Sequence, residues 1–283
     1  MRRFKLFHET IYDFQSEVTL GPHKLLIRPR EGHDIRIESS TLNITPVATV
    51  KWYRDELDNS VAITRFTKPT HQLKIVSEVV IQHYDEWPLD FLVEDYAVQY
   101  PFAYEHEEHR ALSPYLHCKQ DHSQLFEDWL AQFNRPGSIE TYSLLSQISE
   151  VIGSENQYRV REEPGVQSPA QTLQTTSGSC RDYAWLFMCA ARRLGLATRF
   201  VSGYLHAPAT ELDYGSTHAW AEVYLPGAGW KGFDPTIRQI TGCHHIPTAV
   251  SILPEAIPPV SGRFTGPKGE NPNLGVRVRV QSV

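Results

Sequence analysis

The residues from 180 to 194, CRDYAWLFMCAARRL, constrain the fold of this chain more than any other stretch. They predict a helix that is apolar on nearly every side, and such a helix has to be surrounded by other elements rather than cover one face of a core. Ser177 or Ser179 is placed to cap its start, and Gly195 to end it. The chain therefore needs a domain with this helix at its centre.

Length and charge narrow the class of protein. The 283 residues allow one large domain or two ordinary ones, and the net charge of −6 offers no basic surface for nucleic acid. No apolar run approaches the roughly 20 residues that span a bilayer, and the N-terminus lacks the apolar region and cleavage site of a signal peptide. We expect a soluble, cytoplasmic protein that binds neither nucleic acid nor membranes. Its oligomeric state stays open.

The first hundred residues predict β-structure. Short strand-like runs, separated by turn residues, occur at residues 18–20, 24–28, 34–38, 60–66 and 73–81. Short strands at this spacing are typical of an antiparallel sandwich. We therefore predict an N-terminal β-rich domain over residues 1–100 and a second domain over residues 101–283.

The second domain mixes helices with strands. Besides the central helix, apolar periodicity predicts helices at residues 123–133 and 138–152, the latter capped by Ser138 and stopped by Gly153. Strand-like runs follow at residues 197–204, 218–225, 229–234 and 275–280. The turn at residues 226–229 predicts that the second and third of these runs form an antiparallel hairpin. The fold class is α+β.

Cys180 stands at the entrance of the central helix, where a structural cysteine is not expected. The chain has four cysteines, at positions 118, 180, 189 and 243, with no CxxC pair, which indicates reduced thiols. A thiol is mostly protonated at neutral pH, and a helix N-terminus favours the thiolate because its N–H groups are unpaired. Gly178 lets the preceding turn pass tightly, and first-turn amides could stabilise an oxyanion. We therefore interpret Cys180 as a nucleophile.

A catalytic cysteine needs a base and an acceptor that orients the base. His218 begins one strand of the predicted hairpin and Asp234 ends the other. Antiparallel pairing brings such ends together, so Asp234 can accept the far ring N–H of His218. The predicted catalytic set is Cys180, His218 and Asp234.

Three blocks, GSCRDYAW, RRLGLATRFVSGYL and THAWAEVYLPGAGWKGFDPT, resemble the bacterial transglutaminase-like family, which is related to transglutaminases and cysteine proteases. HKLLIRPR and DELDN resemble landmarks of the β-rich domain that often precedes that core. The resemblance implies a papain-like α+β core, acyl transfer through a thioester, and the roles of nucleophile, base and orienting acid for Cys180, His218 and Asp234. It leaves open whether an amine or water accepts the acyl group.

Simpler interpretations exist for each residue. Cys180 could be a small buried side chain, His218 an ordinary strand residue, and Asp234 a turn residue before Pro235. Arg181 and Asp182 are expected to make structural ion pairs or cap contacts. A metal site is the less favoured interpretation of a polar cluster, because its spacing matches no zinc motif; the same holds for Cys243, His244 and His245. The polar cluster comprises His106, Glu107, Glu108, His109, His117, Cys118 and His122.

The sequence thus predicts a thiol enzyme that acts on peptide-type amides of a protein or peptide substrate, without cofactor or metal. The alternative is a noncatalytic protein-binding module that retains the same core. The second oxyanion donor is undecided among Gln167, Gln171 and Gln174. The walls of a substrate pocket are equally undecided among Tyr204, Trp220 and Trp230.

Overall fold

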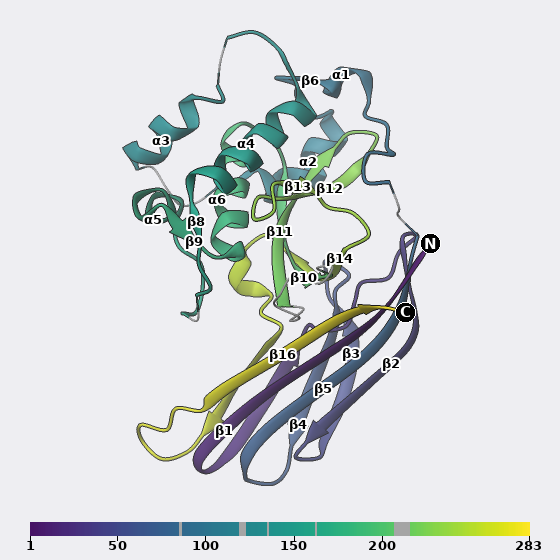
Figure 1. Cartoon of the computed structure of the whole chain (residues 1–283), viewed down its shortest axis with the longest axis vertical. Coiled ribbons are helices and arrows are strands. Elements are labelled where there is room, and N and C mark those ends of the chain that lie inside the picture. Colours follow the sequence, from purple (N-terminus) through teal and green to yellow (C-terminus); the bar gives the residue numbers. More distant parts are fainter. Residues whose placement is uncertain (85–86, 119–122, 135, 162, 207–215) are drawn as a thin grey trace.

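The computed structural model describes residues 1–84, 87–118, 123–134, 136–161, 163–206 and 216–283. Long strands form one end of the molecule, and helices with a second sheet form the other (Figure 1). This is the α+β class predicted from the sequence. None of the described helices is both long and apolar enough to cross a membrane. The cytoplasmic location stays a prediction.

The N-terminal sheet is antiparallel and nearly closed on itself. Its strands follow the order β2-β5-β1-β4-β3, and β15 and β16 also pair with β1. The first half of β1 pairs with β5 and β16, and its last residues pair with β4 and β15, so this one strand crosses from one face to the other. Between the faces lies an apolar core that includes Phe14, Leu25 and Ile75. The strands are β1 (Arg2–Leu25), β2 (Ile35–Thr45), β3 (Ala48–Arg54), β4 (Ser60–Phe66), β5 (Thr70–His83), β15 (Val260–Thr265) and β16 (Asn273–Ser282).

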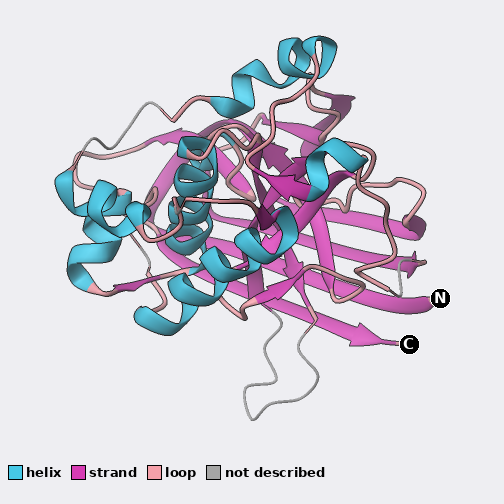
Figure 2. Ribbon diagram, turned by 90° about the horizontal axis from the view of Figure 1, so that it is seen from above, coloured by secondary structure: helices cyan, strands magenta, loops and turns pink. Residues whose placement is uncertain are grey.

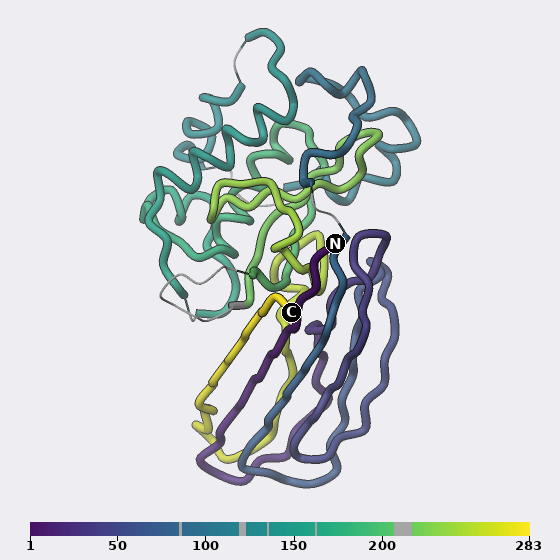
Figure 3. The backbone as a smooth tube through the Cα atoms, turned by 45° about the vertical axis from the view of Figure 1, so that its right-hand side comes forward, coloured from purple at the N-terminus to yellow at the C-terminus, as the bar shows by residue number. Residues whose placement is uncertain are grey.

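The end of the chain returns to its beginning. β16 pairs with β1 from Phe4↔Ser282 to Asp13↔Asn273, and Figure 3 shows the yellow C-terminal strand beside the purple N-terminal one. The predicted strand at residues 275–280 therefore exists, but it belongs to the sheet of the N-terminal unit. A division at residue 100 alone would separate these partners. We accordingly propose a discontinuous N-terminal unit, made of residues 1 to about 83 and 260–283. The second unit is inserted between these two segments.

The second sheet has five antiparallel strands in the order β13-β12-β11-β10-β14, with helices packed over it (Figure 2). The predicted hairpin is β11 and β12, joined by a tight turn that has Gly227 and Gly229 at positive φ. The strands are β10 (Thr198–Leu205), β11 (Ser216–Leu225), β12 (Gly229–Asp234), β13 (Gln239–Ile240) and β14 (His245–Ser251). The helices are α1 (Asp95–Val98), α2 (His106–Leu116), α3 (Gln124–Ala131), α4 (Thr141–Glu155), α5 (Pro169–Thr175), α6 (Cys180–Arg193) and η1 (Pro254–Ala256). Short strands β6 (Gln99–Tyr100) and β7 (Ile139–Glu140) pair with each other, as do β8 (Gln157–Tyr158) and β9 (Ser177–Gly178).

α6 is the central helix that the sequence predicts. Every residue from Asp182 to Arg192 is buried, and the helix packs against β10 and β11. Phe187 stacks on Phe233 of β12, with 5.6 Å between ring centroids, which ties the helix to the sheet. Gly195 follows the helix at φ +81°, as its predicted stopping role requires.

The predicted limits of α4 are wrong at both ends. The N-cap position is Glu140 instead of Ser138 because residues 139 and 140 pair with β6, and the helix continues through Gly153 to Glu155. Position 153 requires glycine because a Cβ there would lie 2.4 Å from the carbonyl oxygen of Pro235. The glycine therefore marks the place where α4 touches the turn that follows Asp234.

The two units share a polar and apolar interface. The side-chain amide of Asn59, which is 0% exposed, bonds the carbonyl oxygen of Val250 at 2.9 Å and accepts the Val250 N–H at 2.8 Å. It thus occupies the free edge of β14 as a neighbouring strand would. The Tyr204 hydroxyl donates to the Ile27 carbonyl at 3.0 Å and lies 2.8 Å from His8 Nδ1. Burial lowers the pKa of His8 to about 4, so this interface histidine is neutral near pH 7.

Candidate active site

Cys180 is the first residue of α6, and Asp182 organises the turn around it. The buried Asp182 carboxylate accepts the Ser179 N–H at 2.7 Å and the Ser179 hydroxyl at 2.8 Å, and it also pairs with Arg161 at 2.6 Å. A Cβ at Gly178 would lie 2.9 Å from the Cβ of Asp182, so only glycine fits there. The structural role expected for Asp182 is confirmed. These contacts fix the backbone that presents the thiol.

The hairpin brings His218 and Asp234 together. β11 and β12 pair Ala221 with Phe233, so the end of β12 lies beside the segment of β11 that carries His218. His218 Nε2 is 2.6 Å from Asp234 Oδ2, and both side chains are buried. The other ring nitrogen, Nδ1, is thereby left for the hydrogen bond between His218 and Cys180. The three residues predicted from the sequence are therefore connected by hydrogen bonds in the order Cys180, His218, Asp234.

The electrostatics of this line favour charge on the ring of His218. Burial alone would lower the pKa of His218, but the charge and hydrogen bond of Asp234, together with the bond to Cys180, outweigh it and raise that pKa well above its usual value. Burial alone would raise the pKa of Asp234, and the two histidines that contact it, His218 and His245, lower it instead. Asp234 is therefore ionised at neutral pH.

Tyr158 is a member of the site that the sequence did not indicate. Its side chain is 48% exposed and hydrogen-bonds to Cys180. Burial of its hydroxyl and the neighbouring Cys180 raise the pKa of Tyr158 to about 12, so the phenol keeps its proton at neutral pH. β8, which holds Tyr158, pairs in parallel with β9 immediately before Cys180. Only this tertiary pairing brings together two residues that are 22 positions apart.

His245 is the second residue that sequence reasoning missed. Its Nε2 lies 3.1 Å from Asp234 Oδ2, the same oxygen that contacts His218. Asp234 Oδ1 accepts the Thr236 N–H at 2.9 Å. The carboxylate thus has three neighbours on its two oxygens. The sequence indicates His245 only as part of a less favoured metal site with Cys243 and His244, and no local pattern links it to Asp234.

Comparison with known proteins identifies the family of this chain. Residues 132–235, which contain Cys180, His218 and Asp234, match the transglutaminase-like superfamily. Residues 4–82 match the bacterial transglutaminase-like N-terminal region. The chain belongs to the bacterial transglutaminase-like family.

Relatives extend over almost the whole chain. An uncharacterised protein of Mycobacterium tuberculosis is 24% identical over 287 residues, which cover 92% of this chain and 87% of that protein. A crystal structure from Cytophaga hutchinsonii, provisionally described as a cysteine protease, superposes with a TM-score of 0.74 at 18% identity and covers 100% of this chain and 91% of that one. At that identity the likeness concerns the fold, which is that of a transglutaminase-like core with a preceding β-rich unit.

Two of the candidate oxyanion donors of this transglutaminase-like chain use their side-chain oxygens as acceptors in other hydrogen bonds. Gln167 accepts the Thr172 hydroxyl at 3.1 Å, and Gln171 accepts the Ser168 N–H at 2.9 Å as part of the α5 cap. Gln174 is exposed on α5. None of these contacts involves Cys180.

The three aromatic candidates for pocket walls are also engaged elsewhere. Tyr204 contacts the N-terminal unit, Trp220 is buried with its ring 5.2 Å from that of His245, and Trp230 packs on Tyr224 with Arg199 above it. Of these, Trp220 alone touches a residue of the Asp234 network. It supports His245 instead of lining an open pocket.

The polar cluster of residues 106–122 forms no common site in the part of the chain that the structure describes. His106 and His109 are exposed on α2, Glu108 closes the capping box of that helix, and His122 lies outside the described residues. Within the described residues, the group with metal-ligand spacing is His218, Asp234 and His245, whose ligand atoms lie within 4.8 Å of one another. Because these atoms are already hydrogen-bonded to one another, we interpret the group as a proton-holding network.

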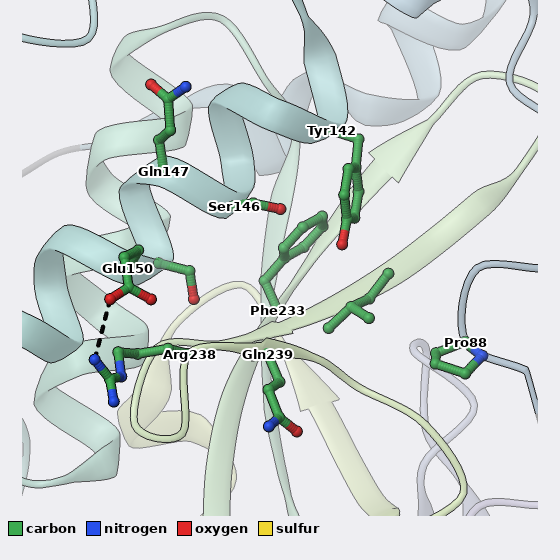
Figure 4. A pocket seen from close by; sticks show the side chains of 10 residues that line it. Pro88, Tyr142, Ser146, Gln147, Glu150, Phe233, Arg238 and Gln239 are labelled. Atoms are coloured by element: carbon green, nitrogen blue, oxygen red, sulfur yellow. Dashed lines mark hydrogen bonds and ion pairs between the residues drawn. The ribbon is translucent and has the colours of Figure 1, made fainter.

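A hollow of about 510 Å³ lies beside the network, between α4 and the β12–β13 edge (Figure 4). Tyr142 and Phe233 face into it, and the ion pair of Glu150 and Arg238, at 3.0 Å, closes one side. The hollow is not lined by the three candidate catalytic residues, Cys180, His218 and Asp234.

Proposed function

We propose that this protein is a thiol enzyme that cleaves or transfers the acyl group of peptide-type amides, at a glutamine side chain or a peptide bond. The observation that carries the proposal is the line from Cys180 through His218 to the buried, ionised Asp234. A nucleophile, a base and an oriented carboxylate in this order constitute the machinery of acyl transfer.

The geometry supports a definite sequence of steps. His218 holds the proton of the Cys180 thiol, and the thiolate attacks the amide carbonyl carbon to form a tetrahedral intermediate. His218 then gives the proton to the departing nitrogen, the carbon–nitrogen bond breaks, and a thioester with Cys180 remains. Water or an amine, deprotonated by His218, attacks the thioester and releases Cys180 as a thiol. Asp234 stabilises the imidazolium each time it forms.

The tetrahedral intermediate carries a negative oxygen, and we assign two hydrogen-bond donors to it. The N–H of Cys180 is in the first turn of α6, where a helix has no acceptor of its own for it. The Tyr158 hydroxyl is the second, because it already contacts the sulfur and retains its proton. We infer that Tyr158 completes the oxyanion site.

Replacing Tyr158 by phenylalanine is expected to lower kcat by about 10²- to 10³-fold, because one donor to the developing oxyanion is lost. Alkylation of Cys180 by iodoacetamide forms no oxyanion and is expected to change much less. Comparing the two rates for wild type and variant separates the roles. A variant that turns over and alkylates faster than wild type would instead show that Tyr158 shields the thiol.

Product analysis tests the reaction class. The full chain is incubated with a peptide library, with and without a primary amine, and the products are identified by mass. New amine adducts at glutamine indicate a transglutaminase, cleaved peptides indicate a peptidase, and glutamate at former glutamine positions indicates hydrolysis of the side chain. A Cys180 that reacts with no electrophile across mildly acidic to neutral pH would favour the noncatalytic binding module.

A further inference from the structure

His245 has a single protonation pattern that fits its surroundings. The Gly242 N–H points at His245 Nδ1 at 3.3 Å, and a backbone N–H can only donate. Nδ1 is therefore the acceptor of this ring, so its proton is on Nε2. Nε2 faces Asp234 Oδ2 at 3.1 Å, where a donor is needed. The side chain is 5% exposed, and the Trp220 ring packs against it edge-on at 5.2 Å.

We propose that His245 is a positioning residue, which donates a hydrogen bond to Asp234 and thereby holds that carboxylate ionised and aimed at His218. This inference rests on the proposed thiol mechanism and adds a fourth residue to it. Asp234 Oδ2 receives both histidine N–H groups, and Oδ1 receives Thr236. Removing His245 would leave Oδ2 with one donor, free to turn away from the line to Cys180.

His245 also connects the site to the N-terminal unit. His244, which precedes it, accepts a hydrogen bond from Arg2 of β1 at 2.9 Å and lies 3.0 Å from His206. The titratable groups that face His245 are Asp234 and His218 across the sheet and His244 on the same chain segment. The inserted unit is thus anchored to β1 one residue away from the carboxylate network.

The test compares His245→Gln with His245→Met. The two side chains have nearly the same length, and only glutamine offers an N–H near the position of Nε2. We expect His245→Met to lower kcat about tenfold, the size of a lost hydrogen bond to a charged group, and to move the acid limb of Cys180 alkylation to higher pH. His245→Gln should retain most of the activity and the wild-type pH profile.

A measurement on the wild type makes the test independent of how the variants fold. Nitrogen-15 NMR of the histidine rings at neutral pH should show His245 uncharged with its proton on Nε2. A charged ring or a proton on Nδ1 would overturn the inference, as would His245→Met with unchanged turnover and alkylation profile. Failure of wild-type Cys180 to alkylate would refute the proposed function instead, so the two failures are distinguishable.

A second feature, independent of the active site, is the approach of Cys118 to Cys189. Their sulfurs lie 2.9 Å apart without a disulfide, although the residues come from the segment after α2 and from the middle of α6. The buried guanidinium of Arg192 lies close to both sulfurs and bonds the His117 carbonyl oxygen at 3.2 Å. A neighbouring cation favours the thiolate that disulfide exchange requires.

We infer that Cys118 and Cys189 form a disulfide when a disulfide oxidant such as oxidised glutathione is present. The half-buried Cys118 attacks the oxidant and releases one glutathione; buried Cys189 then attacks the Cys118 sulfur and releases the second. Two thiols are oxidised and one oxidant molecule is reduced to two glutathiones. The bond would tie the segment after α2 to the helix that carries the nucleophile.

The experiment uses the full chain carrying Cys180→Ala, so that the proposed nucleophile consumes no oxidant. Oxidised glutathione should lower the intact mass by two hydrogen atoms, yield a Cys118–Cys189 cross-linked peptide, and raise Tm by several degrees because a long loop is closed. Adding Cys118→Ala should abolish all three effects, and adding Cys243→Ala should abolish none. A lasting glutathione adduct, a cross-link to Cys243 or an unchanged mass would refute the pair.

Discussion

Replacement of Cys180 by alanine is expected to abolish covalent labelling by a thiol electrophile and to lower turnover by about 10⁴ or more, because Cys180 is the nucleophile that hydrogen-bonds to His218 among the residues that the structure describes. The fold should be retained, since Cys180 is only partly buried and alanine suits the first turn of a helix. Mass mapping of the labelled peptide and a circular dichroism spectrum check both expectations.

The other cysteines serve as matched controls. Cys118→Ala, Cys189→Ala and Cys243→Ala should all keep the label on Cys180. Cys189→Ala removes a sulfur from the centre of α6, where the side chain is 0% exposed, and is expected to cost about 1 kcal/mol of stability without affecting labelling. If the label is found on Cys118 or Cys189 in the wild type, the assignment of Cys180 as the nucleophile is refuted.

Asp234→Asn is expected to lower turnover by about 10- to 10³-fold. Asparagine can keep the hydrogen bond from the Thr236 N–H through its side-chain oxygen. Its NH₂ group then points at the two histidine ring nitrogens that donate to Oδ2 in the wild type. Both His218 and His245 would have to change tautomer, and His218 would lose the charge that stabilises its protonated form. Serine triads lose about 10⁴ on this change, and a cysteine site should lose less because its ion pair can form before substrate binds.

The pH dependence of Asp234→Asn provides the matching signature. Asp234 raises the pKa of His218, so its loss lowers that pKa and weakens the imidazolium that stabilises the thiolate. Alkylation of Cys180 should therefore slow near neutral pH and recover in alkali. A variant with the wild-type alkylation profile and normal turnover would mean that Asp234 only forms the turn before Pro235.

The sequence by itself determined the central helix, the hairpin and the three residues in line. α6 was predictable because a run that is apolar on every side allows only a buried helix, and Gly195 marks its end. The short glycine-rich turn between β11 and β12 constrains the pairing of the two strands, so the ends that carry His218 and Asp234 had to meet. Both features depend on residues that are close together in the sequence, so the sequence pattern predicts them directly.

Only the tertiary structure decided which residues complete the site and which strand the C-terminal strand pairs with. Tyr158 reaches Cys180 through the pairing of β8 with β9. The His245 side chain reaches Asp234 although β10 and β11 lie between β14 and β12 in the sheet. β16 alternates like any exposed strand, and nothing in its residues indicates β1 as its partner. Side-chain periodicity records which face of an element is buried but not which distant element covers it, and that choice depends on packing of the whole chain.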